Sequence, residues 1–398
     1  MTDTVAGLMP VAEAQARLLA DAPIVATEML SIESAAGRWA ARDIAALRTQ
    51  PVNDLSAMDG YAIRFADLPG PFGVIGESAA GHGFDGQVGP GQAVRIFTGA
   101  AMPAGADTVM VQEEVRRDDA RATLTGEGPA SIGQNVRRQG LDFAQGATLI
   151  AKGDRLTPAR IALAATAGHG SLQVNRRVRV AIVATGDELV APGAPLVGAQ
   201  LPESNGVMLA ALLADLPVEL INLGILPDRI EALTSAFAAI DADILVTTGG
   251  ASVGDHDLVR PALIAAGGAI DFWRIALRPG KPMMAGTLGR AIVLGLPGNP
   301  VSAFVTAHLF LRPLIAAMGG AADPLPRSLQ AILGAPLPAN GPRQDYLRGR
   351  TEQGRVVPAA IQDSSMLLTL ARSDCLIVRA PHAAPAQAGD SAEIHPFA

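Results

Sequence analysis

Four short polar segments of this sequence each follow an apolar run, and their residue types suit the binding of an anion. They are 185–188 (Thr-Gly-Asp-Glu), 226–228 (Leu-Pro-Asp), 248–257 (Thr-Gly-Gly-Ala-Ser-Val-Gly-Asp-His-Asp) and 297–302 (Pro-Gly-Asn-Pro-Val-Ser). Glycines and hydroxyl side chains next to the start of a helix offer backbone N–H and O–H donors, which bind phosphate or another oxyanion. We expect substrate contacts from Thr185, Gly186, Asp187, Gly249, Gly250, Ser252, Pro297, Asn299 and Ser302.

The same segments carry carboxylates, which would repel an anion unless a cation lies between them. Mg²⁺ takes oxygen ligands and commonly joins one or two carboxylates to substrate phosphates. The expected metal ligands are Glu188, Asp228, Asp255 and Asp257. Arg278 and Lys281 flank a Pro-Gly turn and add fixed positive charge. His256 fits a bystander better than a ligand, because no second histidine stands at a metal-ligand spacing.

Each of these segments also has a purely structural interpretation. Asp228 and Asn299 both fit the N-cap position of a helix, and Asn299 is followed by a proline, which favours the first helical position. Segment 185–188 fits an ordinary turn, and Gly249-Gly250 fits a flexible one. The functional interpretation depends on all four segments meeting at one edge of a sheet.

A second polar group occurs earlier in the chain. Asp59 stands in a segment dense in small and polar residues, Thr98 follows an apolar run, and the doublet Arg137-Arg138 is followed by Asp142. An arginine pair between glycines could clamp a phosphate, although an exposed pair is usually solvated surface. Asp59-Gly60 also fits a hairpin turn.

The elements that position the first group alternate between strand and helix. Continuous apolar runs predict strands at 178–184, 218–223, 244–247, 270–277 and 291–296, with helices at 206–214, 228–240, 258–266 and 300–318. Buried strands that alternate with helices indicate a doubly wound parallel sheet covered on both faces. Ligands of such sheets bind beyond the carboxyl ends of the strands, where the four polar segments are expected.

The rest of the chain predicts three further units around this α/β domain, which we place at 177–322. Residues 51–137 contain short apolar runs punctuated by Gly, Pro and Asp, which is typical of an inserted β-rich domain. Residues 1–50 and 138–176 would form a discontinuous, elongated helical and extended domain. Residues 323–398 predict a small C-terminal β-barrel or sandwich.

Composition excludes several classes of protein. The net charge of −7 and the lack of basic runs argue against a nucleic-acid partner. The single cysteine, Cys375, stands in an apolar run that predicts a core position, and it allows neither an intrachain disulfide nor a cysteine-rich metal site. No Walker motif or G-x-G-x-x-G occurs. The start of the chain lacks a basic region, and the apolar stretch 291–311 is broken by Pro-Gly-Asn-Pro, so we expect a cytoplasmic protein outside membranes.

Eight blocks of the sequence together resemble the MoeA-like family of molybdopterin molybdenumtransferases, which also supplies the C-terminal part of gephyrin. In order, the blocks are 56–62 (Ser-Ala-Met-Asp-Gly-Tyr-Ala), 97–100, 137–142, 185–189, 204–205 (Ser-Asn), 248–254, 278–282 (Arg-Pro-Gly-Lys-Pro) and 296–302. The resemblance covers about residues 10 to 395. The α/β part alone also resembles molybdopterin adenylyltransferases, but the β-rich insertion and the Asp59 block point away from them.

The resemblance implies an enzyme that inserts molybdate into adenylated molybdopterin, with Mg²⁺ as helper and release of AMP. By matching position it implies catalytic roles for Asp59, Asp142, Glu188, Asp228, Asp255 and Lys281, and substrate contacts from Thr98, Arg137, Arg138, Ser204, Asn205 and Arg278, with Ser364 matching less tightly. It also implies a homodimer in which Asp59 and Thr98 complete the partner's site. A molybdopterin adenylyltransferase and molybdoenzymes would be the hand-over partners.

Two other functions remain open from the sequence. The chain could be an adenylyltransferase that uses ATP and molybdopterin, in which case those two substrates alone would give pyrophosphate. It could instead be a non-catalytic scaffold, which would not need the carboxylates of the four segments. His256 departs from the family pattern, where relatives often carry an aromatic residue.

Overall fold

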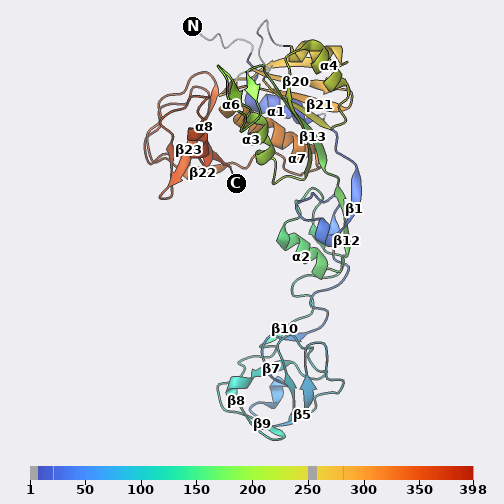
Figure 1. Cartoon of the computed structure of the whole chain (residues 1–398). Coiled ribbons are helices and arrows are strands. Elements are labelled where there is room, and N and C mark those ends of the chain that lie inside the picture. The colour runs from blue at the N-terminus through green and yellow to red at the C-terminus, as the bar shows by residue number, and fades with distance from the viewer. Residues whose placement is uncertain (1–7, 21, 250–257, 281, 398) are drawn as a thin grey trace.

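The computed structural model describes residues 8–20, 22–249, 258–280 and 282–397, and it has an elongated shape (Figure 1). An α/β unit and a C-terminal β unit lie side by side at one end. A narrow stalk of paired strands leads from the α/β unit to a separate β-rich unit at the other end. The polar segments of the α/β unit and those of the inserted unit are therefore far apart within one chain.

A six-stranded mixed sheet forms the centre of the α/β unit. Its order is β16 (Val218–Leu226), β13 (Val178–Thr185), β17 (Ile244–Thr248), β21 (Ala291–Leu296), β20 (Pro282–Leu288) and β18 (Ala269–Arg274). The first four strands are parallel neighbours, whereas β20 runs antiparallel to both β21 and β18.

This arrangement corrects the prediction of an all-parallel sheet. The expected strand 270–277 ends at Arg274, and β20 was not predicted. Only Gly289 and Arg290 lie between β20 and β21, with Leu288 paired to Ala291. A two-residue connection is long enough for a hairpin but too short for a parallel crossover, so β20 must run in the opposite direction.

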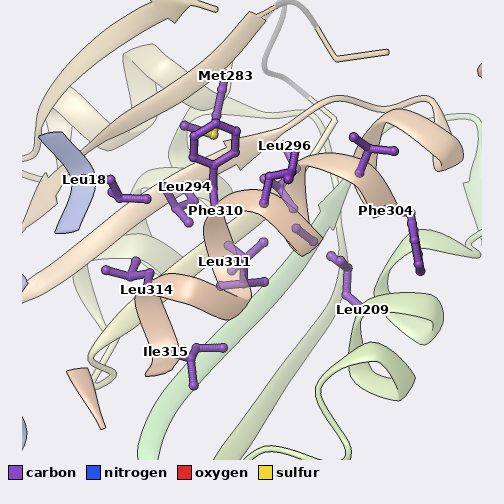
Figure 2. Close-up of a cluster of buried hydrophobic side chains, with 14 of the residues drawn as sticks. Leu18, Leu209, Met283, Leu294, Leu296, Phe304, Phe310, Leu311, Leu314 and Ile315 are labelled. Atoms are coloured by element: carbon purple, nitrogen blue, oxygen red, sulfur yellow. The ribbon is translucent and has the colours of Figure 1, made fainter. Parts of the chain in front are cut away.

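Helices cover both faces of this sheet, as the sequence predicted. Side chains of β13 alternate: Val180 and Ile182 join one apolar cluster, whereas Ala181 and Val183 join another. The first cluster includes residues of α1 (Val11–Ala20), α3 (Asn205–Leu212), α6 (Pro300–Thr306) and α7 (Arg312–Met318), and the second those of α4 (Ile230–Ala238) and α5 (Val259–Ala265). Figure 2 shows part of the first cluster. Because α1 packs here, it lies with the α/β unit rather than with residues 27–50.

The helical run Pro300–Met318 is, among the described residues, the one helix long and apolar enough to span a membrane by length and composition. It consists of α6, a π-helical turn (η4, Ala307–Leu311) and α7. Its side chains pack against the sheet and α3 (Figure 2), and 89 % of its apolar stretch is buried inside the protein. A helix in the core of a protein is equally apolar, and its burial accounts for the composition of Pro300–Met318.

Three short antiparallel ladders form the stalk. They are β1 (Thr27–Ser31) with β12 (Ser171–Asn175), β2 (Ile44–Ala45) with β11 (Thr148–Ile150), and β3 (Leu55–Ser56) with β10 (Val136–Arg137). Helix α2 (Pro158–Thr166) packs beside them. Thr157 caps this helix: its Oγ1 accepts a hydrogen bond from the backbone N–H of Arg160.

The stalk leads into a six-stranded sheet in the inserted unit. The order is β7 (Thr108–Val111), β4 (Gly60–Ile63), β6 (Gln92–Ile96), β5 (Phe72–Ser78), β9 (Arg121–Leu124) and β8 (Val115–Asp118). The start of β4 and the end of β6 pair at Gly60 and Ile96, which brings the residues before β4 and after β6 together.

The C-terminal unit contains another mixed sheet, which includes one strand, β19 (Leu277–Arg278), that follows β18 of the α/β unit. Its order is β19, β23 (Gln344–Glu352), β25 (Cys375–Arg379), β26 (Ser391–Pro396) and β22 (Leu329–Ile332), with β24 (Arg355–Pro358) also paired to β23. An isolated bridge joins Leu333 to Val356, so β22 and β24 lie close together. Cys375 is fully buried, and burial raises the pKa of its thiol to about 12, which confirms a core position.

A buried histidine lies where η4 meets the C-terminal unit. His308 is 6 % exposed, its ring stacks on Phe304 with centroids 6.3 Å apart, and the ring of His395 lies 5.8 Å away. Its Nε2 atom is buried without a hydrogen-bond partner among the described residues. Burial, with smaller effects of His395 and Arg312, lowers the pKa of His308 from 6.5 to about 3. The folded protein therefore holds this ring neutral.

We expect His308 to make the free energy of unfolding fall in acid. The unfolded residue takes up a proton as the pH drops below about 6.5, whereas the folded residue stays neutral down to about pH 3. This contribution is complete above pH 6.5 and is lost between these values, by up to about 1.4 kcal/mol per pH unit. Urea unfolding of the wild type and of His308→Leu from pH 7.5 to 4.5 should show a shallower decline for the variant. An exposed control, His82→Leu, should follow the wild type, and parallel curves for all three would contradict the assignment.

Candidate active site

The parallel strands of the α/β unit end at nearly the same level, which brings their following loops together. Thr185 of β13 pairs with Leu226 of β16, and Ala184 pairs with Thr248 of β17. Thr248 in turn pairs with Leu296 of β21. The loops after all four strands therefore start along one edge of the sheet, here called the rim, as the sequence predicted.

Three carboxylates gather at the rim where β13 and β16 end. The backbone N–H of Asp228 donates a hydrogen bond to Oδ1 of Asp187, at 3.2 Å. A Cβ atom on Gly186 would lie 2.6 Å from Oε2 of Glu188, so the Glu188 carboxylate folds back over this glycine. Burial raises the pKa of the Asp228 carboxyl, and the charges of Asp187 and Glu188 raise it further. A cation would relieve this repulsion between like charges.

Two glycines allow the loops of the rim to approach each other closely. Gly249 has a φ of +85°, and a Cβ atom there would lie 2.7 Å from the carbonyl oxygen of Thr185. A Cβ atom on Gly298 would lie 3.8 Å from Cα of Gly249. The side-chain amide of Asn205, at the start of α3, donates to the carbonyl oxygen of Gly298 at 2.8 Å. Thr185, Gly249, Gly298 and Asn205 thus form one continuous floor.

The C-terminal unit contributes a serine to the same floor. Oγ of Ser364 accepts a hydrogen bond from Nδ2 of Asn299, at 3.1 Å. The carbonyl oxygen of Ser364 accepts from the backbone N–H of Val301 at 3.1 Å, in the first turn of α6. The expected contact residues Asn299 and Ser364 are therefore brought together, although they are 65 positions apart.

The remaining expected contacts differ in how accessible they are. Arg278 is exposed and reaches Oδ2 of Asp345, at 3.4 Å. Ser302 is 4 % exposed, and its carbonyl oxygen accepts from the hydroxyl of Thr306. Ser204 precedes α3 but makes no capping hydrogen bond through its side chain. Pro297 follows β21 directly.

Several expected site residues lie outside the described residues. These are Gly250, Ser252, Asp255, His256, Asp257 and Lys281. Among the residues that are described, no three Asp, Glu, His or Cys side chains are arranged to hold a metal ion. Asp187, Glu188 and Asp228 supply the hard oxygen donors that Mg²⁺ prefers, so the donor chemistry of the rim fits this ion.

Asp59 and Thr98 form a preorganised pair in the inserted unit. Oδ1 of Asp59 accepts hydrogen bonds from the backbone N–H of Thr98, at 2.7 Å, and from its hydroxyl, at 2.9 Å. These bonds lower the pKa of Asp59, and the nearby Arg95 adds a smaller effect in the same direction. The Arg95 guanidinium stacks on Phe97, 4.6 Å from its ring centroid. Asp59 is therefore an ionised carboxylate with a fixed orientation.

The arginine pair at the base of the inserted unit is arranged differently from a free phosphate clamp. Arg138 donates to Oδ2 of Asp54 at 2.6 Å, so its charge is partly compensated. Arg137 is exposed in β10, and Asp142 is exposed in the stalk. The stalk separates Asp59 and Thr98 from the rim of the same chain, and Arg137 of β10 lies at the end of the stalk next to the inserted unit (Figure 1).

The structure also indicates a residue that the sequence analysis missed. Arg348 of β23 is fully buried, and its Nη2 donates to the carbonyl oxygens of Ile361 and Asp363. Both carbonyls belong to the segment that directly precedes Ser364. Its Nε and Nη1 atoms are buried without a partner in the described part of the chain. One signal was available: Arg348 shares the face of the strand with the aromatic Tyr346, which is 2 % exposed.

The chain thus combines a mixed α/β sheet whose polar loops gather at one rim, an inserted β unit on a stalk and a C-terminal β unit. Family models match in chain order: the MoeA N-terminal region (domain I and II) over residues 9–168, a probable molybdopterin binding domain over 181–317, and the MoeA C-terminal region (domain IV) over 330–397. These matches cover most of the chain, and it belongs to the MoeA family.

Individual relatives agree with this assignment. The molybdopterin molybdenumtransferase of Haemophilus influenzae is 37 % identical over 396 residues, which cover 97 % of this chain and 98 % of the relative. The enzyme of the same name from Nostoc is 38 % identical over 337 residues, or 81 % of this chain and 77 % of the relative. The structure of the molybdopterin biosynthesis MoeA protein of Pyrococcus horikoshii matches with a TM-score of 0.82 and 27 % identity, over 98 % of this chain and all of that one.

The repulsion between the rim carboxylates gives a direct test of their placement. Asp187→Asn removes one negative charge near Asp228 but keeps an oxygen that can accept the backbone N–H bond. We expect the pKa of the Asp228 carboxyl to fall in the variant, because less repulsion opposes its ionisation. Carbon-detected NMR titration of the carboxyl groups measures this shift. The distant exposed substitution Asp271→Asn should leave the Asp228 titration unchanged, and an equal effect of both variants would contradict the cluster.

Proposed function

We propose that this chain inserts molybdate into adenylated molybdopterin, releases AMP and forms the molybdenum cofactor. The observation that carries the proposal is the rim itself, where backbone donors and hard carboxylates meet in a chain that belongs to the MoeA family. The relatives named molybdopterin molybdenumtransferase match nearly the full length, which supports the same reaction here. The pterin's own sulfur atoms would bind the metal, in agreement with a single buried cysteine.

Some rim residues would bind the anionic substrates, and others would hold the cation that compensates the substrates' negative charge. The floor formed by Thr185, Gly249, Gly298 and Asn205 offers polar groups for the anionic substrates. We propose that Glu188 and Asp228, with Asp187 beside them and Asp255 and Asp257 expected nearby, hold Mg²⁺. The ion would neutralise charge on the phosphoanhydride that is cleaved. Lys281 and Arg278 would add positive charge at the neighbouring turn.

The attacking oxygen must be positioned while AMP leaves. We propose that a rim carboxylate orients the water or molybdate oxygen that displaces AMP, and that the leaving phosphate stays near Lys281. Asn299 and Ser364 would hold the substrate end that lies towards the C-terminal unit.

A homodimer would bring the two distant polar groups together. Within one chain the stalk separates Asp59 and Thr98 from the rim (Figure 1), and a second copy could present its inserted unit there. The fixed geometry of the Asp59–Thr98 pair supports a role at a ligand rather than at a mobile surface. Arg137, Arg138 and Asp142 would flank the same shared site. We also propose a cytoplasmic location and transfer partners that make or receive the cofactor.

The reaction can be tested with the purified chain. Adenylated molybdopterin, molybdate and Mg²⁺ should yield AMP, and Glu188→Gln should reduce AMP formation by about a hundredfold, because it removes a rim charge without changing the size of the side chain. The control Glu219→Gln changes an exposed glutamate of β16 that pairs with Arg179, and it should remain active. Pyrophosphate release from ATP and molybdopterin alone, without AMP release from the adenylated substrate, would overturn the proposal in favour of an adenylyltransferase.

The shared site predicts complementation between two inactive variants. Asp59→Asn and Glu188→Gln should each be inactive alone, whereas refolded mixtures should recover roughly a quarter of wild-type activity. Half of all dimers in an equal mixture would contain one copy of each variant, and each of these mixed dimers would have one intact site. Mixing either variant with itself provides the control. Failure to recover activity, although mixed dimers form, would show that Asp59 and Glu188 act within one chain or in separate sites.

A further inference from the structure

Arg278 lies at the joint between the α/β unit and the C-terminal unit, and its backbone is fixed to both. β19 leaves the α/β sheet after β18 and pairs in parallel with β23, so that Arg278 lies opposite Asp345. The following turn packs against α6, since a Cβ atom on Gly280 would lie 2.8 Å from Cγ2 of Thr306. The position of Arg278 is thereby defined relative to both units.

A cavity of about 390 Å³ lies beside this joint, and the proposed mechanism does not use it. Arg278, Asp345 and Arg379 line it together with the loops 336–341 and 358–360. The side-chain amide of Asn340 binds three backbone carbonyl oxygens, those of Arg343, Arg379 and Ala380, at 2.8 to 3.1 Å. The cavity is therefore bounded by an ordered loop.

Positive charge exceeds negative charge around this cavity. Asp345 is the one carboxylate among its described lining residues, whereas Arg278 and Arg379 line it and Arg343 also acts on Asp345 electrostatically. Asp345 is 6 % exposed, and burial raises the pKa of its carboxyl in spite of all three arginines. A hollow lined by more guanidinium groups than carboxylates favours a multiply charged anion.

The two lining arginines keep donors that no described residue uses. Nη2 of Arg379 donates to the carbonyl oxygens of Pro338 and Ala384, which fix the plane of the guanidinium and leave Nε and Nη1 without a partner in the described chain. Arg278 makes one long contact with Asp345, at 3.4 Å, among the described residues. The planar guanidinium group matches the oxygen spacing of tetrahedral oxyanions.

We propose that this cavity binds a tetrahedral oxyanion, with Arg278 and Arg379 as the donors to its oxygens. The identity of the anion rests on the proposed function: molybdate and the phosphoryl groups of the adenylated substrate share this chemistry. The turn that follows Arg278 packs at Gly280 against α6, the helix that begins in the rim loop after β21, so this proposal places the anion between the C-terminal unit and the rim. Arg379 becomes a substrate-binding residue that belongs to the C-terminal unit.

Calorimetric titration of the full chain with molybdate and, separately, with pyrophosphate tests the site. The wild type should bind at least one of them at millimolar concentrations or below, and the tighter ligand identifies the source of the oxyanion. Arg379→Gln should weaken that binding by about tenfold or more, because a charge-assisted hydrogen bond is lost. The control Arg350→Gln changes an exposed arginine of β23 outside the cavity and should bind like the wild type.

The outcomes separate this inference from the proposed reaction. Binding by the wild type and by Arg379→Gln with equal affinity, or no binding of either anion by the wild type, overturns the cavity site, and AMP release can still proceed. If Arg379→Gln loses anion binding but the wild type never releases AMP, the anion site is supported and the proposed molybdate insertion is overturned. A circular dichroism melt of each variant shows whether a loss of binding reflects unfolding.

Discussion

Like charges held at one edge of a sheet are the constraint on which the rest of this structure depends. Parallel pairing from Thr185 to Leu226, and from Thr248 to Leu296, places the following loops level with one another, and the chain puts Asp187, Glu188 and Asp228 there. Such a cluster costs folding free energy, because burial and repulsion both oppose ionisation of Asp228. It is explained if a divalent cation and an anionic substrate occupy the rim together.

The other units can be understood through what they add to that edge. The C-terminal unit shares a strand pair with β19 and places Ser364 against Asn299, so it closes the rim on one side. The stalk, in contrast, places the Asp59–Thr98 pair far from the rim of the same chain (Figure 1). Three short ladders of paired strands hold that distance. A second copy of the chain is the simplest way for both polar groups to act on one substrate.

Much of the α/β unit was predictable because its strands and loops are determined by residues close together in the sequence. Continuous apolar runs predicted β13, β16, β17 and β21, and the placement of polar segments after them predicted the rim. The reversed strand β20 was missed because Gly286 and a short hairpin connection leave little periodic signal. The packing of α1 on the α/β unit and the pairing of Ser364 with Asn299 could not be predicted, since both join positions far apart in the sequence. Arg348 was missed because burial of an arginine in a strand depends on its neighbours in space.

The central claim is that the rim carboxylates hold a divalent cation next to the nucleotide. The most direct measurement is anomalous diffraction from crystals grown with AMP and Mn²⁺, an ion that takes the same oxygen ligands as Mg²⁺. Our account predicts a strong anomalous peak within bonding distance of Glu188 or Asp228, with the AMP phosphate beside it. An ordered nucleotide at the rim with no such peak, or a peak bound elsewhere in the chain, would contradict it.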